Sequence, residues 1–192
     1  MTETLSDATL IGLADVLWRA EIEHTPIDPV TDTHPDLSVA EAYRIQTHNV
    51  ERRVAAGGVV RGRKVGLTSR RTQQLFGVDE PTFGVLLDDM FVDDDAEIAL
   101  DELVAPRVEA EIAFRMGADL TGPDVTTDDA LAAIAGALPA IEVVDSRVVD
   151  WRVRLADTVA DNASSARVVL GRRLTPLDEL DLRLLGVLLA PT

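Results

Sequence analysis

Two glutamates separated by one residue lie in the segment PRVEAEIAF, residues 106–114. Side chains alternate along a β-strand, so Glu109 and Glu111 share one face while the apolar residues beside them point the other way. Like charges on one strand face repel each other unless a cation lies over them. The spacing therefore predicts either a cation site or a solvated outer face on which Arg107 and Arg115 supply the cations.

A third carboxylate, Glu142, lies inside LPAIEVVD, residues 138–145, where apolar neighbours indicate a buried strand. Burying a bare carboxylate is costly, so Glu142 needs a partner unless alternation along the strand turns it to water. Three carboxylates on two strands, in a chain with no cysteine, suit a hard divalent cation such as Mg²⁺ or Mn²⁺. Such an ion keeps several waters and so leaves positions open for a chelating substrate.

Lys64, in RGRKVGLTS at residues 61–69, is the only lysine among 18 lysine and arginine residues. An arginine stays protonated, whereas a lysine desolvated beside a metal can lose and regain its proton near neutral pH. A lone lysine among arginines therefore fits general acid–base chemistry. The alternatives are a surface base retained by chance and a structural counterion for a carboxylate.

The composition narrows the classes of function. The net charge of −16 repels phosphates and anionic lipids, so we expect neither nucleic acid nor a membrane as partner. The absence of cysteine excludes disulfides, thiolate metal sites and a cysteine nucleophile. Three histidines, His24, His34 and His48, lack ligand-like spacing, and Ser164-Ser165 lacks the turn motif of a serine hydrolase. Without a signal-peptide pattern or a membrane-length apolar run, we expect a cytoplasmic protein.

The remaining pattern predicts the elements that must position these residues. Helices are expected from Ser6 to about Glu23, from a Ser38–Glu41 capping box to Gly57-Gly58, after Ser69, and over TTDDALAAIAGAL, residues 126–138. Short β-like runs dominate after residue 58: VVRGRKVGL, TFGVLL, AEIAL, RVEAEIAF, PAIEVVD, ARVVLG and DLRLLGVLLA. The chain is therefore expected to be an α+β protein, with a helical N-terminal portion at 1–58 and a β-rich catalytic core at 59–192. We expect the two to form one structural unit.

Five segments in order resemble the 2-keto-4-pentenoate hydratase family of the fumarylacetoacetate hydrolase superfamily: GRKVGLTS, FGVDEPTFGVLLDDM, PRVEAEIAF, LPAIEVVDSR and DWRVRLADTVADNASS. The resemblance implies a mixed, β-rich fold around a divalent-metal site. It also implies that Glu109, Glu111 and Glu142 hold the metal, with Lys64 beside it.

The resemblance further implies a hydro-lyase of aromatic or steroid meta-cleavage catabolism. Such an enzyme adds water to a small-molecule substrate, a 2-hydroxy-2,4-dienoate, and yields a 4-hydroxy-2-oxo acid. Lys64 is the expected proton-transfer residue, Mg²⁺ or Mn²⁺ the expected cofactor, and a homo-oligomer the expected assembly. The expected substrate contacts are Leu67, Ser69, Asn162 and Ser164.

The chain departs from the family pattern at two points. Thr82 occupies the position where many of these hydratases have an aspartate, so a role in proton transfer would fall to water or to another carboxylate such as Asp79. The family pattern also continues beyond Thr192, so we expect the fold to be C-terminally incomplete.

Two alternatives to the hydratase remain open. One is the related 4-oxalocrotonate decarboxylase, which DNASSAR and LDELDLRLLGV fit at least as well, although DWRVRLADTVADNAS favours the hydratase. The other is a catalytically incomplete, truncated paralogue that acts as a binding subunit through an exposed sheet edge.

Overall fold

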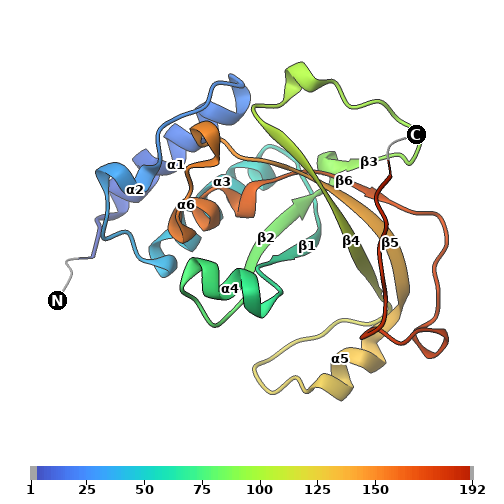
Figure 1. Ribbon diagram of the computed structural model, residues 1–192. Helices are drawn as coiled ribbons and strands as arrows, with labels where there is room; N and C mark the ends of the chain where they lie inside the picture. Colours follow the sequence, from blue (N-terminus) through green and yellow to red (C-terminus); the bar gives the residue numbers. More distant parts are fainter. Residues whose placement is uncertain (1–3, 191–192) are drawn as a thin grey trace. The chain divides into compact units, whose positions relative to one another are not determined.

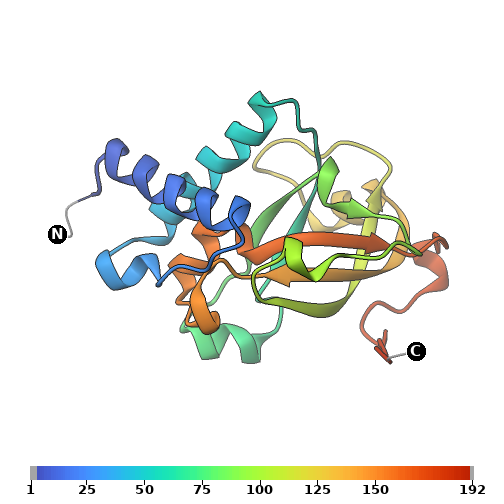
Figure 2. The same cartoon turned by 90° about the horizontal axis from the view of Figure 1, so that it is seen from above.

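A computed structural model describes residues 4–190 of the chain (Figures 1 and 2). They form two compact units. Unit 1 contains the chain up to Met90, Glu97–Arg107 and Val143–Ala166, and unit 2 contains Phe91–Ala96, Val108–Glu142 and the residues from Arg167 onward. Among residues 4–190, no helix has both the length and the apolar character needed to cross a bilayer.

Unit 1 contains four helices that pack around one apolar core: α1 (Asp7–Ile22), α2 (Val30–Thr33), α3 (Val39–Ala55) and α6 (Leu155–Ala160). Figures 1 and 2 show α3 beside both α1 and α6. The fully buried members of the core are Leu10, Ala14, Ala42, Ile45 and Val159. The apolar spacing of the first helix therefore marks its buried face, as expected from the sequence.

The predicted helix caps of unit 1 are confirmed. The hydroxyl of Ser6 accepts a hydrogen bond from the Thr9 amide at the start of α1. Ser38 and Glu41 form the capping box of α3. That helix ends two residues before Gly57, whose φ of 105° is readily available only to glycine.

Unit 1 also contains an antiparallel strand pair, β1 (Val60–Gly66) and β2 (Thr82–Leu87), joined through helix α4 (Arg70–Phe76). Lys64 lies opposite Gly84 in the register of this pair. The predicted helix after Ser69 is confirmed, since the Ser69 hydroxyl accepts a hydrogen bond from the Thr72 amide at its start. The strand pair thus presents Lys64 opposite a residue that has no side chain.

A four-stranded sheet follows the order β3-β6-β5-β4. Its strands are β3 (Phe91–Val92), β4 (Pro106–Met116), β5 (Ile134–Asp145) and β6 (Ser165–Leu170). The first two strands in this order, β3 and β6, run parallel, and helix α5 (Thr127–Ala133) precedes β5. The strands predicted from RVEAEIAF, PAIEVVD and ARVVLG are confirmed, and the mixture of helices and strands confirms the α+β class.

Three elements differ from the sequence prediction. The helix expected over residues 126–138 ends at Ala133, and residues 134–138 begin β5. There Ala137 exchanges backbone hydrogen bonds with Thr175, and a side chain at Gly136 would lie 2.7 Å from the Thr175 oxygen. Pairing with a neighbouring segment has therefore overridden the helical pattern.

The runs AEIAL (96–100) and DLRLLGVLLA (181–190) form no strand within the described residues. In the first run, Ile98 packs against a small apolar cluster. In the second run, Leu184 and Leu188 are exposed. An apolar run becomes a strand only where another strand offers backbone partners, and neither segment has one in residues 4–190.

Candidate metal cluster and lysine site

Three carboxylates of unit 2 converge from neighbouring strands. Glu109 and Glu111 project from β4, and Glu142 projects from β5, which is adjacent to β4 in the sheet. One oxygen of each carboxylate lies within 4.8 Å of the other two. Glu142 is 4% exposed, whereas Glu109 is open to solvent. The expected approach of these three side chains is thus present, and their role as metal ligands stays a prediction.

The chemistry of this group fits a hard divalent cation. All three donors are carboxylate oxygens, the ligand type preferred by Mg²⁺ and Ca²⁺. Their separation is short enough for one ion to contact all three after small side-chain movements. Three negative charges this close repel one another, so a cation among them would lower the electrostatic energy.

Lys64 belongs to unit 1, where its side chain binds a turn that is distant in sequence, at residues 162–164. Its Nζ atom donates a hydrogen bond of 3.1 Å to the backbone oxygen of Ala163. Opposite Lys64 on β2, a Cβ added to Gly84 would lie 2.9 Å from Lys64 Cγ and 2.7 Å from the Asn162 oxygen. Glycine at position 84 therefore allows the turn and the lysine stem to approach the strand pair closely.

The turn that receives Lys64 has an unusual backbone. Asn162, Ala163 and Ser164 have φ values of 51°, 52° and 55°, although none of them is glycine. The Asn162 side chain accepts a hydrogen bond from the Val85 amide at 2.8 Å and donates one to the Val85 oxygen at 2.9 Å. Asn162, expected as a substrate contact, thus uses its side-chain amide to attach the turn to β2, and its contact with a substrate stays a prediction.

The other expected substrate contacts also lie in unit 1. Leu67 follows β1 with a φ of 54°, and its oxygen accepts a hydrogen bond from Gln73. Ser69 caps α4. Ser164 is buried, and its hydroxyl lies 3.5 Å from Asp161 Oδ2. The structure therefore brings Asn162 and Ser164 together with Lys64 through one turn, while Leu67 and Ser69 follow the strand that carries Lys64.

Thr82, at the position where the family resemblance implied an aspartate, begins β2 opposite Gly66 and is 4% exposed. A Cβ at Gly66 would lie 2.8 Å from the Thr82 hydroxyl oxygen. Asp79, the other carboxylate considered for this role, is exposed in the segment before β2. The position of Thr82 is therefore tightly packed.

A buried ion pair that the sequence analysis did not predict adjoins the turn at residues 162–164. Arg147 and Asp161 are both about as buried as the apolar core, with exposed fractions of 3% each. Arg147 Nε lies 2.5 Å from Asp161 Oδ1, and the Arg147 amide donates to Asp161 Oδ2 at 3.1 Å. Desolvation raises the pKa of Asp161 to about 6, against the lowering effect of the adjacent guanidinium. The two contacts nevertheless show Asp161 paired with Arg147.

A second buried carboxylate, that of Asp145, binds the backbone amides directly before β4. Asp145 accepts hydrogen bonds from the amides of Val104 and Ala105, the shortest of them 2.6 Å. The sequence contained a hint of both buried groups, because charged residues interrupt otherwise apolar or small residues in EVVDSRVV and VADNASS. Charged residues in such runs are buried only when paired, which is the pattern observed here.

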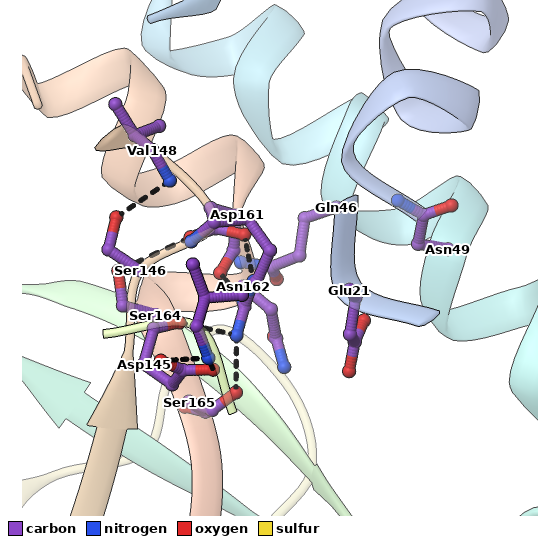
Figure 3. A network of polar contacts seen from close by, with 12 residues as sticks. Glu21, Gln46, Asn49, Asp145, Ser146, Val148, Asp161, Asn162, Ser164 and Ser165 are labelled. Atoms are coloured by element: carbon purple, nitrogen blue, oxygen red, sulfur yellow. Dashed lines mark hydrogen bonds and ion pairs between the residues drawn. The ribbon is translucent and has the colours of Figure 1, made fainter. Parts of the chain in front are cut away.

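A small cavity adjoins the Arg147–Asp161 pair within unit 1. Its volume is about 30 Å³, and Glu21, Asn49 and Gln46 line it together with Arg147 and Asp161. In Figure 3, Glu21 of α1 and Asn49 of α3 lie beside the polar network, among the residues that line the cavity. Asn49 Oδ1 is buried without a hydrogen-bond partner among the described residues. A polar cavity of this size can hold ordered water that would satisfy this oxygen.

Comparisons with known proteins identify the family. No protein-family model matches the chain. The chain is 48% identical to a 2-keto-4-pentenoate hydratase of Paraburkholderia xenovorans, over 92% of this chain and 66% of that protein. It is 44% identical to a 2-hydroxypent-2,4-dienoate hydratase of Pseudomonas putida, over 95% of this chain and 83% of that protein.

A solved structure of 4-oxalocrotonate decarboxylase from Pseudomonas putida G7, complexed with magnesium and adipate, matches with a TM-score of 0.90 and 36% identity. That match covers 95% of this chain and 69% of the decarboxylase. The chain spans about two thirds of the length of the first of these relatives, 66%. These similarities, together with the motifs and the α+β fold, show that the chain belongs to the 2-keto-4-pentenoate hydratase family, within the fumarylacetoacetate hydrolase superfamily.

Proposed function

We propose that the chain carries the catalytic residues of a divalent-metal-dependent hydratase that acts on a 2-hydroxy-2,4-dienoate. The observation that carries this proposal is the group of three glutamates within 4.8 Å of one another, in a chain related to dienoate hydratases. Glu109, Glu111 and Glu142 would hold Mg²⁺, with Mn²⁺ as the second candidate. Bound there, the ion would supply a Lewis acid that stabilises negative charge on the oxygens of a 2-oxo acid.

The proposed reaction moves protons in two stages. In the first, the 2-hydroxyl of the dienol loses a proton and C5 gains one, which gives the conjugated 2-oxo-3-enoate. In the second, water adds across the C3–C4 double bond, with its hydroxyl on C4 and its proton on C3. Both stages need a group that can accept and return a proton, and Lys64 is the residue to which we assign this role.

The protein environment of Lys64 supports that assignment. Its Nζ atom is held at 3.1 Å by the Ala163 oxygen, and the side chain is half-buried on β1. A hydrogen bond to a fixed carbonyl limits the positions that the amine can take. An amine held in one position transfers a proton more effectively than a freely moving surface lysine.

The test is the loss of absorbance of a 2-hydroxydienoate in the presence of Mg²⁺. We expect turnover that stops when a chelator is added and returns when Mg²⁺ is restored. The Glu142→Gln variant should lose the activity, whereas Glu179→Gln, an exposed glutamate outside the group, should keep it. Turnover that survives complete chelation would rule out a metal-dependent hydratase.

A 2-oxo acid decarboxylase is the second candidate, because the chain superposes on 4-oxalocrotonate decarboxylase with a TM-score of 0.90. The two reactions differ in their products, so the same assay separates them. A hydratase yields a 4-hydroxy-2-oxo acid without gas release, whereas a decarboxylase releases CO₂ from a 2-oxo diacid. Sedimentation of the same sample would test the predicted homo-oligomer.

A further inference from the structure

The turn that receives Lys64 stores conformational strain. Three consecutive residues, Asn162, Ala163 and Ser164, occupy the left-handed region, with φ between 51° and 55°. These backbone angles are unfavourable for residues other than glycine. Such a turn persists only when its surroundings hold it more strongly than it is strained. The interactions around it therefore show what keeps it in place.

The Arg147 side chain brackets the turn at both ends. Its Nη2 atom donates to the Asp161 oxygen at 2.6 Å, directly before the turn. Its Nη1 atom donates to the Ser165 oxygen at 3.3 Å, directly after the turn, and to the Asp145 oxygen at 2.6 Å. Figure 3 shows Asp161, Ser165 and Asp145 grouped around this network. One planar guanidinium thus links three separate backbone oxygens as well as a carboxylate.

The Asp161 side chain completes the arrangement from the other direction. Its two oxygens accept from Arg147 Nε and from the Arg147 backbone amide, while its backbone oxygen also accepts from the Ser164 amide at 2.8 Å. Both carboxylate oxygens of Asp161 and all three guanidinium nitrogens of Arg147 are therefore used in hydrogen bonds within the pair or with backbone oxygens. A pair that only neutralised charge would not require this set of backbone contacts.

The middle residue of the turn makes the contact with the candidate acid–base group. Ala163 lies between the two ends that Arg147 fixes, and its oxygen accepts from Lys64 Nζ. If the turn relaxed to ordinary backbone angles, the carbonyl of Ala163 would rotate away from the position that it now occupies. The position of the Lys64 amine would then change, although no group in contact with it had been altered.

We propose that Arg147 and Asp161 are positioning residues for Lys64. Their buried ion pair fixes the left-handed turn at residues 162–164, and the turn holds the Lys64 amine through the Ala163 oxygen. This inference rests on the proposed function only where it concerns activity, because the position of the amine can be measured without turnover.

The first variant is Arg147→Lys, which keeps the positive charge but cannot reach three backbone oxygens at once. We expect kcat to fall roughly 10- to 100-fold with KM changed less than about 3-fold, the scale of a displaced catalytic group. In a Lys64→Met background the same substitution should cause no further loss, because its effect passes through Lys64. Arg154→Lys is the matched control, since Arg154 also donates to a backbone oxygen, that of Thr31, away from the turn.

The second readout is the rate at which an amine-acylating reagent modifies Lys64, followed by mass spectrometry of the peptide that contains it. Lys64 is the only lysine of the unsubstituted chain, and the lysine added in each variant lies at position 147 or 154, so a peptide that contains Lys64 alone reports its modification separately. We expect Arg147→Lys to raise this rate at least about 3-fold, as expected for an amine released from a fixed hydrogen bond. Arg154→Lys should leave it unchanged.

The neutral double variant Arg147→Gln with Asp161→Asn leaves no buried charge unpaired and serves if Arg147→Lys does not fold. The same changes in kcat and in acylation rate are expected for it. A folded variant with wild-type kcat and wild-type acylation of Lys64 would overturn the proposal. A second pair of results would also overturn it. These are unchanged acylation of Lys64 in Arg147→Lys, and a loss of kcat from Arg147→Lys that is equally large in the Lys64→Met background. If the wild type shows no dienoate turnover, the proposed function fails, whereas the acylation result still decides the positioning role.

Discussion

Replacing one carboxylate of the glutamate group should change the metal-free and metal-bound proteins in opposite directions. Glu109→Gln keeps the size of the side chain but removes its charge and most of its ability to bind a hard cation. Without metal, the substitution removes repulsion between like charges. With metal, it removes a ligand. A metal site therefore predicts two effects of opposite sign from a single substitution.

The geometry sets the size of the first effect. Two unit charges 4.8 Å apart, the upper limit of the separation here, repel by about 0.9 kcal/mol in water, the relevant medium for the exposed Glu109. Replacing Glu109 removes two of the three repulsive pairs. The metal-free variant should therefore be as stable as the wild type or more stable, by up to about 2 kcal/mol at low ionic strength.

The second effect follows from binding linkage. At a Mg²⁺ concentration of about 100 times Kd, binding stabilises the folded protein by about 2.7 kcal/mol. For a chain of this size, 1 kcal/mol corresponds to about 2–4 °C in Tm, so Mg²⁺ should raise the Tm of the wild type by about 5–11 °C. The same concentration should raise the Tm of Glu109→Gln by less than about 2 °C, because its Kd is much higher.

Thermal unfolding with and without Mg²⁺ measures both effects in one instrument. Glu179→Gln is the control, since it removes one exposed glutamate of the same unit outside the group. Its Mg²⁺-induced shift should equal that of the wild type. An equal shift in Glu109→Gln would show that the three carboxylates are not the ligands. A lower metal-free Tm would show that Glu109 stabilises the fold through other contacts by more than the repulsion costs.

Three further predictions concern unit 1. Lys64→Arg and Lys64→Met should both lower kcat roughly 10²-fold or more with an unchanged Mg²⁺-induced Tm shift, and near-normal turnover of Lys64→Arg would exclude proton transfer by Lys64. Gly84→Ala should lower stability by about 1–3 kcal/mol in chemical denaturation, because its Cβ would lie 2.7 Å from the Asn162 oxygen, and a neutral result would show that the turn can shift freely. Hydrogen bonds from the Ser38 hydroxyl and amide and from the Leu5 amide lower the pKa of Glu41 below 4.5. The stability advantage of the wild type over Glu41→Gln, about 1 kcal/mol, should therefore be full above that value and disappear as the pH falls through the lowered pKa.

The local patterns predicted much of the fold because they depend on neighbours in the chain. The Ser6 cap, the Ser38–Glu41 capping box and the end of α3 before Gly57 each involve residues within four positions of one another. Alternation placed Glu109 and Glu111 on one face of a strand for the same reason. The prediction of a helix over residues 126–138 was wrong for residues 134–138. There Thr175, which is distant in sequence, exchanges backbone hydrogen bonds with Ala137.

For the candidate site, too, the sequence predicted the residues, and the tertiary structure decided their arrangement. The types and spacing of Glu109, Glu111, Glu142 and Lys64 singled them out in the sequence, since their chemistry is a property of the side chains themselves. That strands β4 and β5 are adjacent, and so bring three carboxylates within 4.8 Å, depends on sheet order. The left-handed turn and the Arg147–Asp161 pair depend on tertiary structure even more strongly, because strained backbone angles and buried charges are stable only where groups from several distant segments surround them.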